Sequence, residues 1–218
     1  MGAVRWLHLS DLHHGDLTIA EQAPALWAEF LRDLGKAHEL SGPWDLVFVT
    51  GDLTREGSVS NFASLSRTLE ALLSRLEELG SNPRLVVAPG PHDALRLSSR
   101  PAAAWALFGY WRPDAHDLRG ELWEQPTNEY RAAIVLAFQP FLSWRDAEPQ
   151  VLKGAPGWIP GDLVAQLETG GLRVTIACLN TAFLGIVDEC LEGEMGVRQI
   201  ELIDAIRRPF AQGPGCTL

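Results

Sequence analysis

Short apolar runs alternate with amphipathic stretches along the first half of the chain. Residues 4–10, 45–50 and 84–88 are rich in Val and Leu and predict three β-strands. Between them, residues 21–40 repeat apolar side chains at helical spacing, and so does a second stretch that begins after Ser58. Apolar strands that alternate with helices are typical of a parallel sheet with right-handed crossovers. The order β-α-β-α-β therefore predicts an α/β layered fold.

The second half of the chain is less regular. We predict one helix over residues 101–111 and another over residues 129–144. Residues 112–127 are rich in Pro, Asp and Gly and predict an irregular insertion on the surface. Residues 163–179 predict a β-hairpin, and residues 197–210 predict a last helix.

The C-terminal end has the pattern of an interrupted domain. Residues 212–215 predict a turn, and Cys216-Thr217-Leu218 then predict the first residues of another strand. Because no repeat and no linker divides the sequence, we expect residues 1–218 to form a single domain that is incomplete at its C-terminus. We expect the native protein to continue past Leu218 or to be completed by a partner domain.

Composition and charge exclude several classes of protein. The 218 residues are 46% hydrophobic and 21% charged, which is typical of a soluble globular domain. The 28 acidic residues outnumber the 18 basic ones, so the net charge of −10 provides no positive field for long nucleic acids. No apolar run is long enough to span a membrane. The three cysteines match neither a disulfide framework nor a zinc motif, so we expect a cytoplasmic protein.

Polar residues follow each of the predicted parallel strands. Asp11 and His13 come after the first strand, Asp52 after the second, and His92 and Asp93 after the third. A fourth polar cluster, Asn180-Thr181, follows the later strand that ends at Leu179. In an open α/β sheet, ligands bind at the carboxyl ends of the strands. We therefore expect these residues to converge on one edge of the sheet.

These residue types suit divalent metal ions. Asp11 and His13 are two positions apart, so a turn brings both side chains to one cation, and Asp52 can bridge two cations. Carboxylate and imidazole ligands suit Mn, Fe or Zn. Two ions roughly 3.5–4 Å apart clamp a phosphoryl group and acidify a bridging water. They also supply the positive charge that the acidic surface lacks.

Each residue taken alone also has a structural interpretation. Asp11 suits a helix N-cap or a turn, Asp52 suits the turn chemistry of Gly-Asp after a strand, and His92 suits a hydrogen-bonded histidine. The placement of the whole set after successive strands favours the metal site over these alternatives.

The ordered set resembles the motifs of the calcineurin-like metallophosphoesterase superfamily. The resemblance rests on three blocks: Asp11-Leu12-His13 with Gly15, Gly51-Asp52-Leu53-Thr54, and Gly90-Pro91-His92-Asp93. Weaker support comes from Leu179-Asn180-Thr181. The resemblance implies a layered, metallophosphoesterase-like β-sheet sandwich flanked by helices, of which this chain holds the first part.

The resemblance also implies a role for each residue. Asp11 and His13 resemble ligands of the first metal, and Asp52 resembles the carboxylate that bridges two metals. His92 resembles the histidine that contacts the phosphate or protonates the leaving oxygen, and Asp93 resembles its orienting partner. The implied activity is hydrolysis of a small phosphomonoester or phosphodiester through a metal-activated hydroxide, with two divalent ions in the complete domain.

Two departures from the family pattern leave a second hypothesis open. Pro91 replaces the asparagine that ligates the second metal, and proline offers no side-chain ligand. The late histidine motifs are also missing, because none of the six histidines lies beyond His116. The alternative is therefore a catalytically impaired or truncated module that serves binding or regulation in a larger protein.

Overall fold

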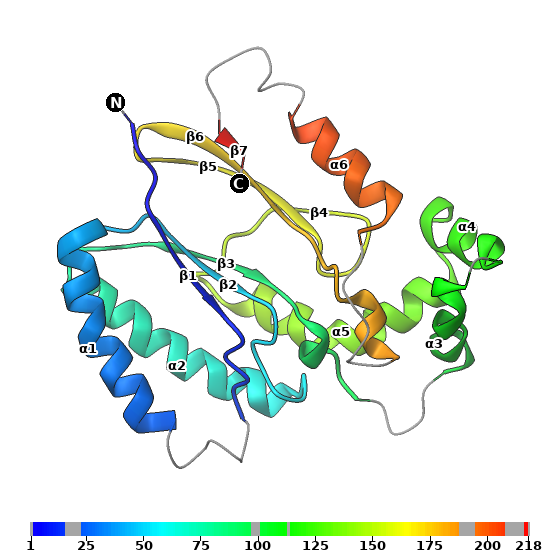
Figure 1. Ribbon diagram of the computed structural model, residues 1–218, viewed down its shortest axis with the longest axis horizontal. Helices are drawn as coiled ribbons and strands as arrows, with labels where there is room; N and C mark the ends of the chain where they lie inside the picture. Colours follow the sequence, from blue (N-terminus) through cyan, green and yellow to red (C-terminus); the bar gives the residue numbers. More distant parts are fainter. Residues whose placement is uncertain are drawn as a thin grey trace.

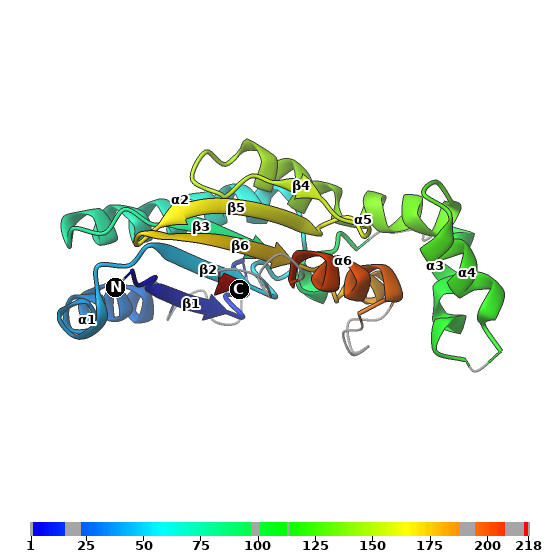
Figure 2. The same ribbon diagram turned by 90° about the horizontal axis from the view of Figure 1, so that it is seen from above.

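Two β-sheets pack face to face in the residues that the structure, a computed structural model, describes (Figure 1, Figure 2). The described residues are 2–15, 23–96, 101–112, 114–187, 195–207 and 216–217. The first sheet is parallel and has the order β1-β2-β3, with β1 at Trp6–Ser10, β2 at Leu46–Thr50 and β3 at Arg84–Ala88. All three strands lie where the sequence predicts them.

Helices α1 (Ala23–Ser41) and α2 (Val59–Glu78) connect these strands and cover one face of the parallel sheet (Figure 1). Apolar side chains of β2 and β3 point into this layer and meet buried leucines of both helices. The side chain of Ser58 accepts a hydrogen bond of 3.2 Å from a backbone N–H in the first turn of α2, which confirms the predicted N-cap. The predicted start of α1, at residues 21–22, lies outside the described residues. The α/β layered fold is thus confirmed.

The second sheet covers the other face of the parallel sheet and has the order β4-β5-β6-β7. Its strands are β4 (Ala155–Pro156), β5 (Leu163–Thr169), β6 (Leu172–Cys178) and β7 (Cys216–Thr217). Strands β5 and β6 form the predicted antiparallel hairpin, and β7 pairs in parallel with β6. The strand expected at the C-terminal end is therefore present.

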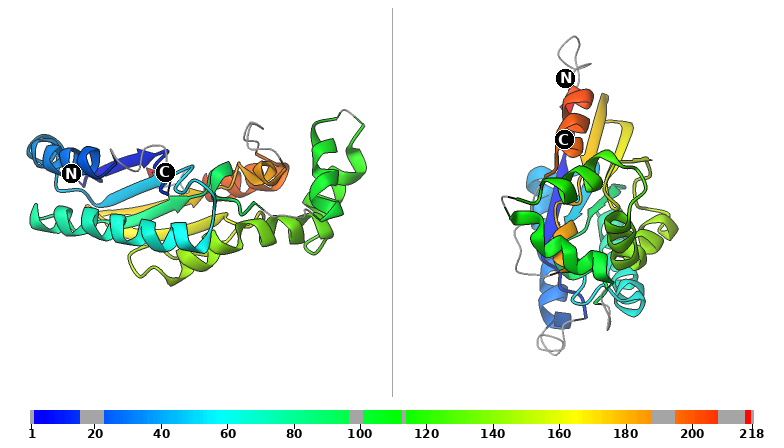
Figure 3. Two further views of the ribbon diagram at one scale, coloured as in Figure 1. Left: turned by 90° about the horizontal axis from the view of Figure 1, so that it is seen from below. Right: turned by 90° about the vertical axis from the view of Figure 1, so that its right-hand side faces the viewer.

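A helical extension at one end of the molecule contains α3 (Ala102–Ala106), the 3-10 helix η2 (Leu107–Trp111) and α4 (His116–Glu124) (Figure 3). Helix α5 (Glu129–Ala147) runs from this extension back to α2, where Phe141 and Trp144 join the core beside the parallel sheet. The predicted helix over residues 101–111 is thus divided into an α-helical and a 3-10 part.

The prediction of an irregular insertion over residues 112–127 was wrong, because α4 occupies its centre. Leu122 and Trp123 are buried in a core cluster, and the indole N–H of Trp123 donates a hydrogen bond of 2.9 Å to the hydroxyl of Tyr110. Burial of these side chains against the neighbouring helices outweighs the turn-forming composition of the segment.

Helix α6 (Val197–Arg207) begins at the predicted residue, and the predicted positions 208–210 lie outside the described part of the chain. Two short 3-10 helices complete the fold: η1 (Pro91–Asp93) follows β3, and η3 (Phe183–Ile186) follows β6. Among the described helices, none combines the length and the hydropathy that crossing a membrane requires.

Candidate metal centre

The three loops that follow β1, β2 and β3 begin at the same edge of the parallel sheet. The last residues of the strands, Ser10, Thr50 and Ala88, stand in register across the sheet. Asp11 follows directly after β1, and the backbone N–H of Asp11 donates a hydrogen bond of 3.1 Å to the carbonyl of Gly51. The parallel register therefore brings the predicted polar residues of these loops together, as expected for strands that share one sheet edge.

Three of the predicted ligands have a strained backbone. Asp11, His13 and Asp52 have φ angles of 55°, 41° and 48°, and among the described residues they are the non-glycine positions with positive φ. Such a conformation costs on the order of 1–3 kcal/mol per residue and persists where the surroundings enforce it. Here the backbone N–H of His13 donates to the carbonyl of Asp52 at 2.9 Å, so the two loops hold each other. Backbone strain concentrated at these three residues indicates a functional site.

The side chains of the same three residues point toward one another. Nε2 of His13 lies 4.0 Å from a carboxylate oxygen of Asp11 and 3.8 Å from Oδ2 of Asp52. Both distances are too long for hydrogen bonds. Two atoms that each bind one ion at about 2.1 Å lie at most about 4.2 Å apart, so a shared cation fits both contacts. The donor set of two carboxylates and an imidazole fits Mn, Fe or Zn.

His92 also reaches this group. Ligand atoms of His13, Asp52 and His92 lie within 4.8 Å of one another, and the two imidazole rings meet edge to face at 4.8 Å between centroids. The backbone N–H of His92 donates a hydrogen bond of 3.0 Å to Oδ1 of Asp52, which leaves Oδ2 directed at His13. Asp11 is not in the group of three and joins the site through its contact with His13.

Asp93 has contacts that differ from its expected role. Its buried carboxylate accepts hydrogen bonds from the backbone N–H groups of Gly90, Leu53 and Thr54, at 2.9, 3.0 and 2.8 Å, and one from the Thr54 hydroxyl. Burial raises the pKa of Asp93 to about 6, although the four hydrogen bonds act in the opposite direction. These contacts tie the loop after β2 to the loop after β3.

The resemblance implied Asp93 as the orienting partner of His92, but the side chain that contacts the His92 ring is that of Arg55. Nη1 of Arg55 lies 2.9 Å from Nδ1 of His92, whereas the hydrogen bonds of the Asp93 carboxylate go to the loop backbone and to Thr54. Arg55 is not among the residues that the sequence pattern predicts for the site. Its one signal is that it directly follows the block Gly51-Asp52-Leu53-Thr54.

Sequence comparison decides the family of this chain. A profile described as calcineurin-like phosphoesterase matches residues 4–162, nearly three quarters of the sequence. The chain belongs to this family. The matched range contains the whole parallel sheet and every candidate ligand, and members of the family are metal-dependent phosphoesterases. No curated protein matches the sequence.

The first two residues of the third family block, Gly90, which matches the family, and Pro91, which departs from it, have structural reasons in this chain. An added Cβ at Gly90 would lie 2.3 Å from both the backbone nitrogen and Oδ1 of Asp52, so only glycine allows this approach. Pro91 packs against η3, because an added Cβ at Gly185 would lie 2.6 Å from Cβ of Pro91. The position that supplies an asparagine ligand in the family therefore serves packing here.

Asn180, which supported the family resemblance weakly, lies in a buried polar network instead. Its side chain donates to the carbonyl of Pro160 at 2.7 Å and accepts from the backbone N–H of Ala182 at 3.0 Å. Its backbone N–H donates to Asp162, whose carboxylate also accepts a hydrogen bond of 2.8 Å from Gln199. The loop after β6 thus contributes a satisfied structural network, and the predicted convergence holds for the three parallel strands.

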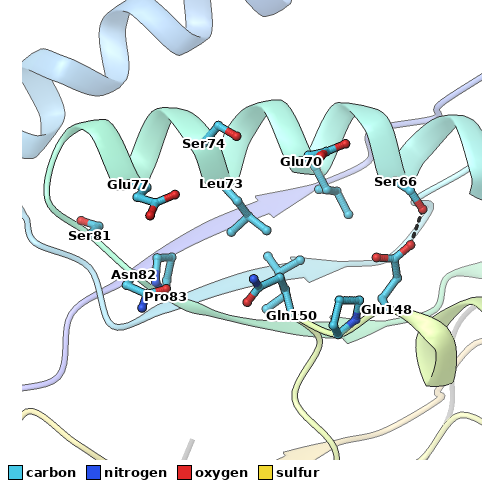
Figure 4. A pocket seen from close by; sticks show the side chains of 13 residues that line it. Ser66, Glu70, Leu73, Ser74, Glu77, Ser81, Asn82, Pro83, Glu148 and Gln150 are labelled. Atoms are coloured by element: carbon cyan, nitrogen blue, oxygen red, sulfur yellow. Dashed lines mark hydrogen bonds between the residues drawn. The ribbon is translucent and has the colours of Figure 1, made fainter.

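The candidate ligands fit one divalent ion of the pair that is typical of the family. Within the described part of the chain, His13, Asp52 and His92 are the one set of three or more His, Cys, Asp or Glu side chains with metal-like spacing. A cavity of about 650 Å³ lies elsewhere, between α2 and the segments flanking β3 and α5 (Figure 4). Its lining includes Glu70, Glu77 and Glu148 and none of the candidate ligands, so it is separate from this site.

Proposed function

We propose that this chain forms the metal-binding part of a phosphoesterase that hydrolyses a small phosphomonoester or phosphodiester. The proposal rests on one observation above all. Asp11, His13 and Asp52 combine a strained backbone with carboxylate oxygens within 4.0 Å of one imidazole nitrogen. Family membership supports the reaction class, and the substrate is our inference from the acidic surface, which disfavours long nucleic acids.

Each candidate residue has a separate role in the proposed reaction. Asp11, His13 and Asp52 hold a divalent ion, which when bound acts as a Lewis acid toward a phosphoryl oxygen and lowers the pKa of a bound water. Asp52 is oriented by the His92 amide, so that its Oδ2 faces the imidazole of His13, where both would hold the ion. The imidazole of His92, beside the ligands, contacts the phosphate or donates a hydrogen bond to the departing oxygen.

The complete domain holds two such ions, of Mn, Fe or Zn, in this proposal. A C-terminal continuation or a partner domain then supplies the ligands of the second ion. The protein acts in the cytoplasm.

A second function is favoured by a specific observation. Pro91 packs against η3 and offers no ligand, and the described residues contain one candidate group rather than two. A chain that binds one ion and turns over poorly would serve as a binding or regulatory module in a larger protein.

The experiment measures metal binding and hydrolysis separately. The full chain is titrated with Mn²⁺ and with Zn²⁺ by calorimetry, and hydrolysis of p-nitrophenyl phosphate and bis-p-nitrophenyl phosphate is followed with each metal. We expect Asp52→Asn to lower metal affinity by at least about hundredfold, since even partners outside the ligand shell contribute 10–100-fold. Glu77→Gln, an exposed carboxylate on α2, is the matched control.

The outcomes separate the two functions. Metal-dependent hydrolysis that Asp52→Asn abolishes supports the phosphoesterase. One tightly bound ion without hydrolysis supports the binding module, and hydrolysis that is unchanged in Asp52→Asn contradicts the proposed site.

A further inference from the structure

The contact between Arg55 and His92 determines which nitrogen of the imidazole carries the proton. We propose that Arg55 is a positioning residue that holds neutral His92 in the tautomer protonated on Nε2. The role of that proton in phosphoester hydrolysis rests on the proposed function, whereas the tautomer itself does not.

Two groups of Arg55 lie against the same ring nitrogen. Nη1 of the guanidinium is 2.9 Å from Nδ1 of His92, and the backbone carbonyl of Arg55 is 3.3 Å from the same atom. A guanidinium only donates hydrogen bonds, so the first contact requires an unprotonated Nδ1. The carbonyl only accepts, so the second requires Nδ1–H. In a neutral imidazole the two contacts exclude each other, and the guanidinium contact has the better distance.

Both partners are anchored before they meet. The backbone N–H of Arg55 donates to the carbonyl of His14 at 3.1 Å, which ties Arg55 to the loop after β1. The preceding residue, Thr54, is fully buried and is bonded to Asp93 through its N–H and its hydroxyl. The backbone of His92 is held by Asp52. The guanidinium therefore reaches Nδ1 from a backbone that two neighbouring loops fix.

The tautomer decides between two roles for His92 that its position allows. A nitrogen that binds a metal needs a free lone pair, whereas a nitrogen that donates a hydrogen bond to the substrate needs a hydrogen. With Nδ1 occupied by Arg55, the hydrogen is on Nε2, the remaining nitrogen. His92 is therefore a hydrogen-bond donor to the substrate and not the third ligand of the ion that His13 and Asp52 hold.

The direct test is the tautomer in the metal-free chain. Long-range ¹H–¹⁵N correlation spectra, recorded at a pH where the ring is neutral and assigned with His92→Gln, report which nitrogen is protonated. We expect the Nε2–H form in the unmodified chain, a shift toward Nδ1–H in Arg55→Ala, and partial return of Nε2–H in Arg55→Lys. Arg32→Ala, which removes an exposed arginine of α1, is the control.

Kinetics and metal titration provide a second readout. We expect Arg55→Ala to lower kcat by about tenfold, less than the hundredfold or more that loss of a hydrogen-bond donor to the reacting oxygen costs, with KM changed much less. Metal affinity should stay the same or rise, because Nε2 becomes free to bind the ion.

The outcomes are distinguishable from failure of the proposed function. An Nδ1–H tautomer in the unmodified chain overturns the role of Arg55, whatever the activity. A fall in metal affinity in Arg55→Ala that matches the fall in kcat also contradicts it. The expected tautomer together with absent hydrolysis leaves the Arg55 assignment supported and refutes the phosphoesterase.

Discussion

Polar residues follow the strands of both sheets, yet the two ends differ in exposure, hydrogen bonding and strain. After the parallel strands, the side chains of Asp11, His13 and Asp52 are 68%, 29% and 15% exposed, and their oxygens and nitrogen face one another across 3.8 to 4.0 Å. At the open end of the antiparallel hairpin, Asp162, which precedes β5, and Asn180, which follows β6, are almost fully buried and hydrogen-bonded. The first cluster is suited to a ligand, and the second stabilises the fold.

Backbone conformation separates the two clusters as clearly as hydrogen bonding does. Asp11, His13 and Asp52 have positive φ, and Asp162 and Asn180 are not among the positive-φ residues. Backbone strain at three residues whose side chains face one another points to a binding role. A buried carboxylate with several donors needs no such explanation, because the donors compensate its loss of water.

The largest effect on stability is expected from a substitution in the buried cluster of Asp162 and Asn180. Asp162 accepts hydrogen bonds from Ile159, Asn180 and Gln199, at 2.9, 2.8 and 2.8 Å. Asp162→Ala leaves the buried N–H groups of Ile159 and Asn180 without a partner and removes one of the two acceptors of the Gln199 amide, so we expect the free energy of unfolding to fall by about 3–5 kcal/mol. Urea denaturation measures this loss, with Glu77→Gln as control. A loss below about 1 kcal/mol would contradict the structural role, because a single lost hydrogen bond already costs that much.

A smaller effect on stability is expected from metal binding at the cluster of Asp11, His13 and Asp52. Metal binding to the folded chain stabilises it by about 2.7 kcal/mol when the free ion is at a hundred times its Kd. We therefore expect Mn²⁺ to raise the Tm of the unmodified chain and of Glu77→Gln, but not of Asp52→Asn. Differential scanning calorimetry gives the comparison. An equal rise in Asp52→Asn would place the binding elsewhere.

The smallest effect is expected from relief of the backbone strain at Asp11. Asp11 has a φ of 55° and an exposed side chain, so Asp11→Gly relieves the backbone while removing one ligand. We expect a gain of about 1 kcal/mol in the metal-free chain, together with weaker metal binding. Chemical denaturation with and without Mn²⁺ measures both. A variant that is less stable without metal would show that the loop is not strained at this position.

Local patterns predicted most of the fold. The strands β1, β2 and β3 and the N-cap of α2 follow from residues adjacent in sequence, because apolar runs and capping side chains act over a few positions. The pattern failed at α4, where buried Leu122 and Trp123 face partners that come from other segments. Helix propensity depends on residues close in sequence, so it does not reflect packing against distant segments.

Most of the candidate site was also predictable from local sequence patterns. Asp11, His13, Asp52 and His92 follow from their position after parallel strands, since register carries strand ends to one edge. The role of Asp93 in joining two loops was not predictable, because two of its backbone donors, Leu53 and Thr54, lie 40 and 39 positions away in the chain.

The amino-acid sequence by itself determined the α/β order of the chain and the residue types of a metal site, because both depend on periodicity and on chemistry after each strand. The tertiary structure alone decided the partners of the other polar residues. It directed Asp93 to the loop backbone, Asn180 to a buried network and Arg55 to Nδ1 of His92. Contacts between loops depend on how the sheet aligns them in space, and spacing along the chain does not encode that alignment.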